Sequence, residues 1–186
     1  EDEELAGQSP SLNLAGVHYA SHSQIRHVFS ADFGRRFSLV PVSKRRQELM
    51  AIDWVEEATV SKIWPNTLKV HIDERRPVAF VHLPPNRKDG MSEFALIDKD
   101  GFILRPRVAA KFTLPVMTGI RESESREDRR ARVRRVLSML RALGPSGDRI
   151  SEIDVSDPNN LVIAEHLENR VLNLMLGDEN FASRMT

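Results

Sequence analysis

Three histidines lie close together in the stretch HYASHSQIRH, and imidazole is a common metal ligand. A metal site would need His18, His22 and His27 to converge with at least one further ligand. We expect His18 near the end of a strand, His22 at the start of a helix and His27 inside that helix. This arrangement favours three exposed histidines over a metal site.

Two pairs of carboxylates are candidates for acid–base chemistry. Glu56 and Glu57 fall on an expected exposed strand, and Asp98 and Asp100 fall in an expected turn. Neither pair has a histidine or serine nearby in the sequence that would complete a catalytic set. The chain contains no cysteine, which excludes thiol catalysis and thiolate metal sites. The sequence therefore predicts neither an enzyme nor a cofactor.

The stretch RESESREDRRARVRRVLSMLRALG, residues 121–144, is rich in arginine and could bind phosphate groups. However, Lys plus Arg and Asp plus Glu both total 27, so the net charge is zero and nucleic acid is not favoured as a partner. Its apolar residues keep helical spacing and predict a helix packed on a core. A solvated basic face is favoured, and contact with anionic lipid or an acidic partner stays open. The basic residues are Arg126, Arg129, Arg130, Arg132, Arg134, Arg135 and Arg141.

The elements that must position these side chains divide into two groups. A length of 186 residues fits one large domain or two small ones. Residues 1–11 are expected to be a disordered lead-in, since they are acidic and polar. Neither a signal peptide nor an apolar run of about 18 residues is visible. We place the domain boundary at Pro77, which lacks an N–H and cannot extend a central strand.

Residues 12–76 read as βααββ. A strand over 12–17 precedes a helix capped by Ser21 or Ser23, and Ser43 is expected to cap a second short helix. A hairpin follows, in which residues 55–63 fold back onto the strand after the turn Trp64-Pro65-Asn66. In that second strand the alternation predicts Leu68, Val70 and Ile72 in the core and Lys69 outside. Trp54 and Trp64 are assigned to structural packing.

Residues 77–186 read as a larger antiparallel β domain with flanking helices, so the fold class is α+β. A helix over 121–143, ended by Gly144-Pro145, interrupts the strands. The predicted strands cover residues 78–83, 94–97, 102–104, 150–155, 161–167 and 171–176, and the last two form a hairpin.

An ordered series of motifs now carries a resemblance. In the first half these are Gly16, YAS at 19–21, GRRF at 34–37, IDWV at 52–55, WPNTL at 64–68 and ERRPVA at 74–79. In the second half they are LIDKDG at 96–101, LPVMTG at 114–119 and LGDENF at 176–181. The series resembles the extracytoplasmic region of the FtsQ/DivIB cell-division proteins, in which a POTRA domain precedes a β domain.

The resemblance implies a non-enzymatic scaffold of the division machinery on the outer, periplasmic face of the cytoplasmic membrane, at the septum. The β domain would bind coiled-coil division proteins of the FtsB and FtsL type, and the POTRA domain would bind other divisome proteins. We expect docking around the last predicted strand and the segment after it. The candidate binding residues are Leu172, Leu174, Leu176, Phe181 and Arg184.

The resemblance also implies a short cytoplasmic tail and one membrane span before Glu1, and a chain that continues past Thr186. The alternative function is a POTRA-type chaperone or assembly factor for membrane or secreted proteins. Such a protein would show tandem POTRA repeats or a barrel, and residues 81–186 show neither pattern. An enzyme built on the β domain is disfavoured by the lack of a convergent catalytic set.

Overall fold

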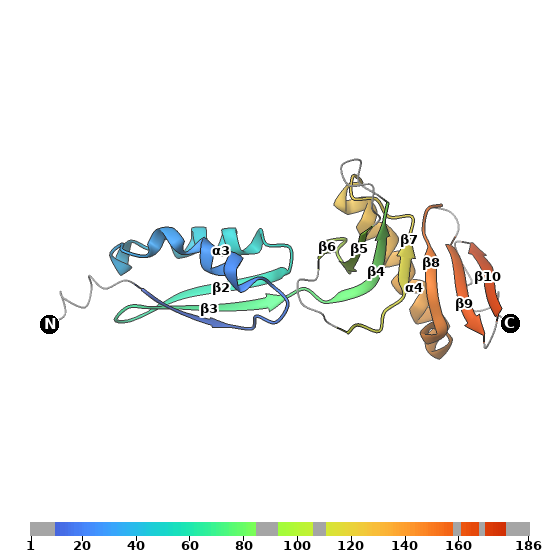
Figure 1. Cartoon of the computed structure of the whole chain (residues 1–186), viewed down its shortest axis with the longest axis horizontal. Helices are drawn as coiled ribbons and strands as arrows, with labels where there is room; N and C mark the ends of the chain where they lie inside the picture. The colour runs from blue at the N-terminus through green and yellow to red at the C-terminus, as the bar shows by residue number, and fades with distance from the viewer. Residues whose placement is uncertain (1–9, 85–92, 106–110, 158–160, 168–169, 178–186) are drawn as a thin grey trace. The chain divides into compact units, whose positions relative to one another are not determined.

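The computed structural model describes residues 10–84, 93–105, 111–157, 161–167 and 170–177 (Figure 1). The chain divides into two compact units between Arg75 and Arg76. We call them the first and the second unit and describe each by itself. Both contain helices and a β-sheet, which confirms the predicted α+β class.

The first unit has the predicted βααββ order, with two short 3-10 helices added. Its sheet has the order β1-β3-β2, in which β1 runs parallel to β3 and β2 runs antiparallel to it. Helices α2 and α3 lie over one face of this sheet (Figure 1). The elements are β1 (Ser11–Ala15), α2 (His22–Val28), η1 (Ser30–Asp32), η2 (Phe37–Leu39), α3 (Val42–Met50), β2 (Val55–Ile63) and β3 (Thr67–Glu74).

The two α-helices of the first unit begin differently. The Ser21 hydroxyl accepts the Gln24 backbone N–H at 3.3 Å and caps α2, as predicted. The prediction that Ser43 caps α3 is wrong. That helix begins at Val42, two residues earlier than a Ser43 cap implies, with Pro41 at the N-cap and no side-chain cap. Proline suits a helix start because its missing N–H would have had no partner there.

The alternating apolar residues of β3 lie in the core of the first unit, as predicted. Leu68, Val70 and Ile72 are at most 1% exposed, and Lys69 is exposed. Trp54 is buried and its ring centroid lies 5.2 Å from that of Tyr19. The packing predicted for Trp64 is wrong: the residue follows β2 in the turn, and 68% of it is exposed.

Two carboxylates tie the irregular parts of the first unit to its regular elements. The Glu74 side chain, at the end of β3, accepts the backbone N–H groups of residues 18–20 at 2.7–3.0 Å. The buried Asp32 side chain accepts two hydrogen bonds from Arg45 of α3. This partner raises the pKa of the Arg45 guanidinium further above its usual range, despite the opposing effect of burial. Arg45 therefore stays charged.

The second unit is built on one seven-stranded sheet of order β10-β9-β8-β7-β4-β5-β6. Four of the neighbouring pairs are antiparallel, but β7 runs parallel to both β4 and β8. The predicted antiparallel sheet is thus a mixed one. The elements are β4 (Pro77–Leu83), β5 (Glu93–Asp98), β6 (Ile103–Leu104), β7 (Val116–Thr118), α4 (Arg126–Leu143), η3 (Gly144–Arg149), β8 (Ile150–Asp154), β9 (Leu161–Leu167) and β10 (Arg170–Gly177).

The parallel pairing follows from α4, which returns the chain from β7 to β8. Adjacent parallel strands need such a crossover, since a tight turn cannot join them. Ser125 caps the helix by accepting the Asp128 N–H at 3.1 Å, so α4 begins at Arg126, five residues later than predicted. Val133, Val136, Met139 and Leu143 of α4 are buried in one apolar cluster with residues of the sheet. Figure 1 shows α4 lying across the face of that sheet.

Candidate functional site

Among the residues that the structure describes, the long edge strand of the second unit's sheet is the eight-residue β10. The opposite edge strand, β6, has only two residues. An edge strand presents unpaired backbone N–H and C=O groups, to which a further strand can bind. Of the two edges of this sheet in the described part of the chain, β10 alone is long enough to bind several residues of a partner strand.

The hairpin β9–β10 is anchored on the core through β8. Ile150 and Ile153 of β8 and Ile163 of β9 are buried in the cluster under α4. Strand β9 pairs antiparallel with both β8 and β10. The β10 edge therefore continues a sheet whose strands β8 and β9 contribute residues to the core.

Three of the candidate binding residues lie in β10. Leu172 stands opposite Glu165 of β9, and Leu174 stands opposite Ile163. Leu176 falls at an irregularity, since the register shifts between Met175 and Gly177. Phe181 and Arg184 lie outside the described residues. The structure thus brings three candidates onto one edge strand, and their role in binding stays a prediction.

The first unit has two edge strands of its own, β1 and the nine-residue β2. Part of the β2 edge is occupied by a side chain from α3. Arg46 Nε donates to the Ala58 carbonyl oxygen at 2.8 Å, and the same guanidinium pairs with the Glu57 carboxylate. Such side-chain contacts protect an edge from strand addition. The β2 edge is therefore less open than its length indicates.

The three histidines that the sequence offered as metal ligands are surface residues of the first unit. His18, His22 and His27 are all exposed, and the described residues contain no group of three potential metal ligands. Asp98 differs from the expected turn carboxylate because it is only 2% exposed. It accepts the backbone N–H groups of Asp100 and Phe102 at 2.9 and 2.8 Å, which fixes the turn between β5 and β6.

Several arginines of α4 have a structural role that their spacing in the sequence does not reveal. Arg129 donates to the carbonyl oxygens of Gly101, Glu122 and Glu124, at 2.9, 3.1 and 2.5 Å. Arg132 donates to the Gly119 carbonyl oxygen at 2.7 Å. These side chains bind loops of their own unit, so part of the guanidinium donors of α4 is already occupied.

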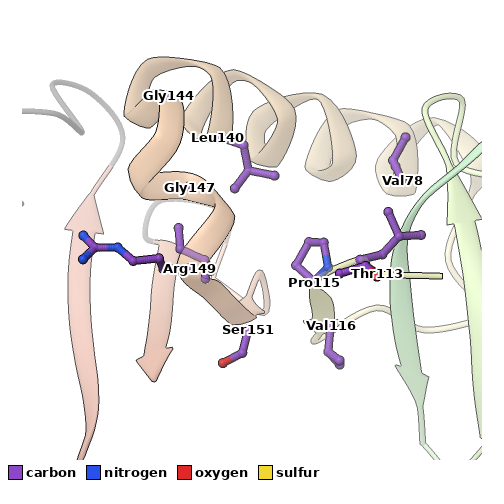
Figure 2. Close-up of a pocket in the computed structure, with 11 residues that line it drawn as sticks. Val78, Thr113, Pro115, Val116, Leu140, Gly144, Gly147, Arg149 and Ser151 are labelled. Carbon is purple, nitrogen blue, oxygen red and sulfur yellow. The ribbon is translucent and has the colours of Figure 1, made fainter. Parts of the chain in front are cut away.

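A mainly apolar pocket of about 770 Å³ lies between the end of α4, η3 and the segment that enters β7. Figure 2 shows Leu140 of α4 on one side of it and Pro115 and Val116 on another. The Arg149 side chain extends away from these residues (Figure 2). Among the described residues that line this pocket, apolar side chains predominate, and they indicate no particular ligand chemistry.

The sequences of both units match known protein families. Residues 11–75 match the POTRA domain, FtsQ-type, and residues 87–186 match the C-terminal domain of cell division protein FtsQ/DivIB. Neither match is to an assembly factor with tandem POTRA domains. None of the helices in the described ranges has both the length and the apolar character needed to cross a bilayer.

Curated relatives carry the name cell division protein FtsQ. The protein of Koribacter versatilis is 33% identical over 183 residues, which are 95% of this chain and 50% of that protein. The protein of Bordetella pertussis is 38% identical over 69 residues, 37% of this chain and 25% of the relative. The protein of Zymomonas mobilis is 34% identical over 68 residues, which are 37% of this chain and 22% of that protein. The chain thus spans about half the length or less of these relatives.

Proposed function

Since the chain belongs to the FtsQ/DivIB family of cell-division proteins, we propose that it is a non-enzymatic scaffold of the divisome. Its partners are coiled-coil division proteins of the FtsB and FtsL type, which bind by adding a strand to the open edge of the second unit. The observation that supports this site is the position of β10, eight residues long, at the end of the seven-stranded sheet.

The main chain of β10 supplies only part of the expected affinity. A partner strand would form about five main-chain hydrogen bonds, each contributing about 0.5–1.5 kcal/mol net. Micromolar binding corresponds to about 8 kcal/mol. Apolar contacts must supply the remainder, and Leu172, Leu174, Leu176 and Phe181 are the candidates. Arg184 would pair with an acidic partner residue at the rim of the interface.

The test is a titration of the chain with the extracytoplasmic part of the coiled-coil partner, followed by backbone amide shifts. Two variants, Asn173→Pro and Leu174→Pro, probe the edge directly. Neighbouring residues of a strand direct their N–H groups to opposite sides, so one of these groups faces β9 and the other faces the partner. Proline removes the N–H in each case.

One proline variant should keep the fold and weaken partner binding by about tenfold or more, the factor that corresponds to 1.4 kcal/mol. The other should disturb the β9–β10 pairing itself. The proposed site is excluded if the amide shifts are confined to residues 12–76, or if the folded proline variant binds as tightly as the parent.

The place of action follows from the same proposal. The chain would lie on the periplasmic face of the cytoplasmic membrane at the septum, held by a single membrane span that precedes it in the full protein. The first unit, with its FtsQ-type POTRA match, would bind other divisome proteins. Replacing residues 12–76 by an unrelated domain in the full protein should abolish septal fluorescence of a tagged copy. Binding of the coiled-coil partner to β10 should persist.

A further inference from the structure

Three large apolar residues are exposed at one end of the first unit. Trp64 in the β2–β3 turn is 68% exposed, Leu39 at the end of η2 is 67% exposed, and Ile63 at the end of β2 is 46% exposed. The 3-10 helix η2 and the end of β2 meet here, since Lys62 Nζ donates to the Ser38 carbonyl oxygen at 2.7 Å. We call Leu39, Ile63 and Trp64 the apolar tip.

The charged side chains of the two described segments at the apolar tip are all basic. The two segments that form this end, residues 33–41 and 60–70, contain no acidic residue. Their four basic residues are all exposed, so the tip is surrounded by positive charge that would attract an anionic surface. These residues are Arg35, Arg36, Lys62 and Lys69.

The chain enters the first unit beside the apolar tip. The Ser11 backbone N–H donates to the Asn66 carbonyl oxygen at 2.8 Å, and the Ser11 hydroxyl lies 3.0 Å from that of Thr67. Figure 1 shows the start of β1 at the same end as the β2–β3 turn. On the proposed function, a membrane span precedes β1, and this step rests on it. The tip would then be at the end of the unit that faces the bilayer.

We propose that the apolar tip inserts into the headgroup region of an anionic phospholipid bilayer. Tryptophan favours this region because its ring is apolar and its N–H is polar, and basic side chains add attraction to anionic lipids. A protein partner is less suited, because stable interfaces bury about 800 Å² on each side, more than three side chains at a turn offer. Residues 1–4 of the sequence are acidic, so the proposal relies on the apolar contact more than on charge.

Such a small contact holds a free protein only weakly, so the first test uses the full chain attached to vesicles, and a second test measures the weak partitioning of the unattached chain. One cysteine added before Glu1 couples it to a maleimide lipid, because the chain has no other cysteine. The vesicles contain phosphatidylcholine with a minority of phosphatidylglycerol. Trp64 is the probe: the other tryptophan, Trp54, is only 4% exposed and is shielded from iodide. On attachment, the emission should shift to shorter wavelength and iodide quenching should fall.

The double variant Leu39→Ser/Ile63→Ser keeps the probe and removes two apolar contacts. Its unattached form should partition into the same vesicles about tenfold less, or weaker still, than the unattached parent. Met50→Ser is the matched control, since Met50 is exposed at the end of α3 that leads into the start of β2. This control should partition as the parent does.

Three results would overturn the proposal. Iodide quenching could stay the same on attachment, or the double variant could partition as well as the parent. The shift could also occur without vesicles and grow with protein concentration, which would assign the apolar tip to contact with a second copy of the chain. Partner binding at β10 needs no lipid, and the proline variants in β10 should keep the vesicle signal. Each proposal can therefore fail alone.

Discussion

Arg45 holds Asp32 through two buried hydrogen bonds, from Nε to Oδ2 at 2.6 Å and from Nη2 to Oδ1 at 2.9 Å. The pair joins α3 to the 3-10 helix η1, and Arg45 also donates to Glu48 at 2.6 Å. Asp32 is fully buried. Its charge therefore depends on Arg45 for compensation inside the first unit.

Arg45→Met should lower the free energy of unfolding of the first unit by about 3–5 kcal/mol, because it leaves a buried carboxylate without its partner. Lys44→Met is the matched control: Lys44 is exposed and lies 3.9 Å from Glu48, so it should change the value by less than about 1 kcal/mol. Urea unfolding followed by tryptophan fluorescence measures both, since both tryptophans lie in this unit. Equal effects of the two changes would contradict the prediction.

Ile72→Ala should destabilise the first unit by about 2–5 kcal/mol, since Ile72 is 1% exposed and its truncation leaves a cavity. Lys69→Glu, on the exposed side of the same strand, should have little effect. Chemical denaturation compares the two. If Lys69→Glu were the more damaging change, the face of β3 that packs on the helices would be assigned wrongly.

Gly16 and Gly34 differ in how closely other backbone atoms approach them. Gly16 and Gly34 both have positive φ, +80° and +88°. A Cβ on Gly16 would overlap the Ile72 carbonyl oxygen of β3, whereas one on Gly34 would meet nothing within 4 Å. Gly34→Ala should cost about 1–2 kcal/mol from its left-handed conformation alone, and Gly16→Ala clearly more. Thermal unfolding of both variants checks this order, and the reverse order would refute it.

The first unit should fold without the second. Its three strands and two helices have their own apolar core, and its order of elements is complete before Arg76. Residues 10–80 expressed alone should give a dispersed amide proton spectrum. A narrow range of shifts, typical of an unfolded chain, would show that the core needs further residues.

The features of the fold that were predicted correctly from the sequence depend on neighbouring residues in the chain. The alternation over β3 identified its core face correctly, because a strand with one buried face has a period of two. The hairpin of β2 and β3 was predicted from a turn between two extended runs. The exposed Trp64 was missed because aromatic type alone does not show whether an element covers a turn.

The features that the sequence did not predict depend on contacts between segments that are far apart in the chain. Strand β7 has three residues, too few for a periodicity, and its parallel neighbours are separated from it by long stretches of chain. Arg129 looked like surface charge because the loop carbonyls it binds come near only in the folded unit. The predicted strand over 171–176 is present within β10, but its place at the edge depends on the order of the whole sheet.

The parallel strand β7 also has a consequence for the stability of the candidate edge. Only two residue pairs join β7 to β4, and three join it to β8. Strands β8, β9 and β10 therefore form an antiparallel group that has few main-chain hydrogen bonds to the remaining strands of the sheet. Groups of strands linked in this way tend to open as separate cooperative units, which amide hydrogen exchange resolves. A partner strand added to β10 would extend this three-stranded group and would not contact β4, β5 or β6. We therefore expect slower exchange in β8–β10 on partner binding, and unchanged exchange in β4–β6.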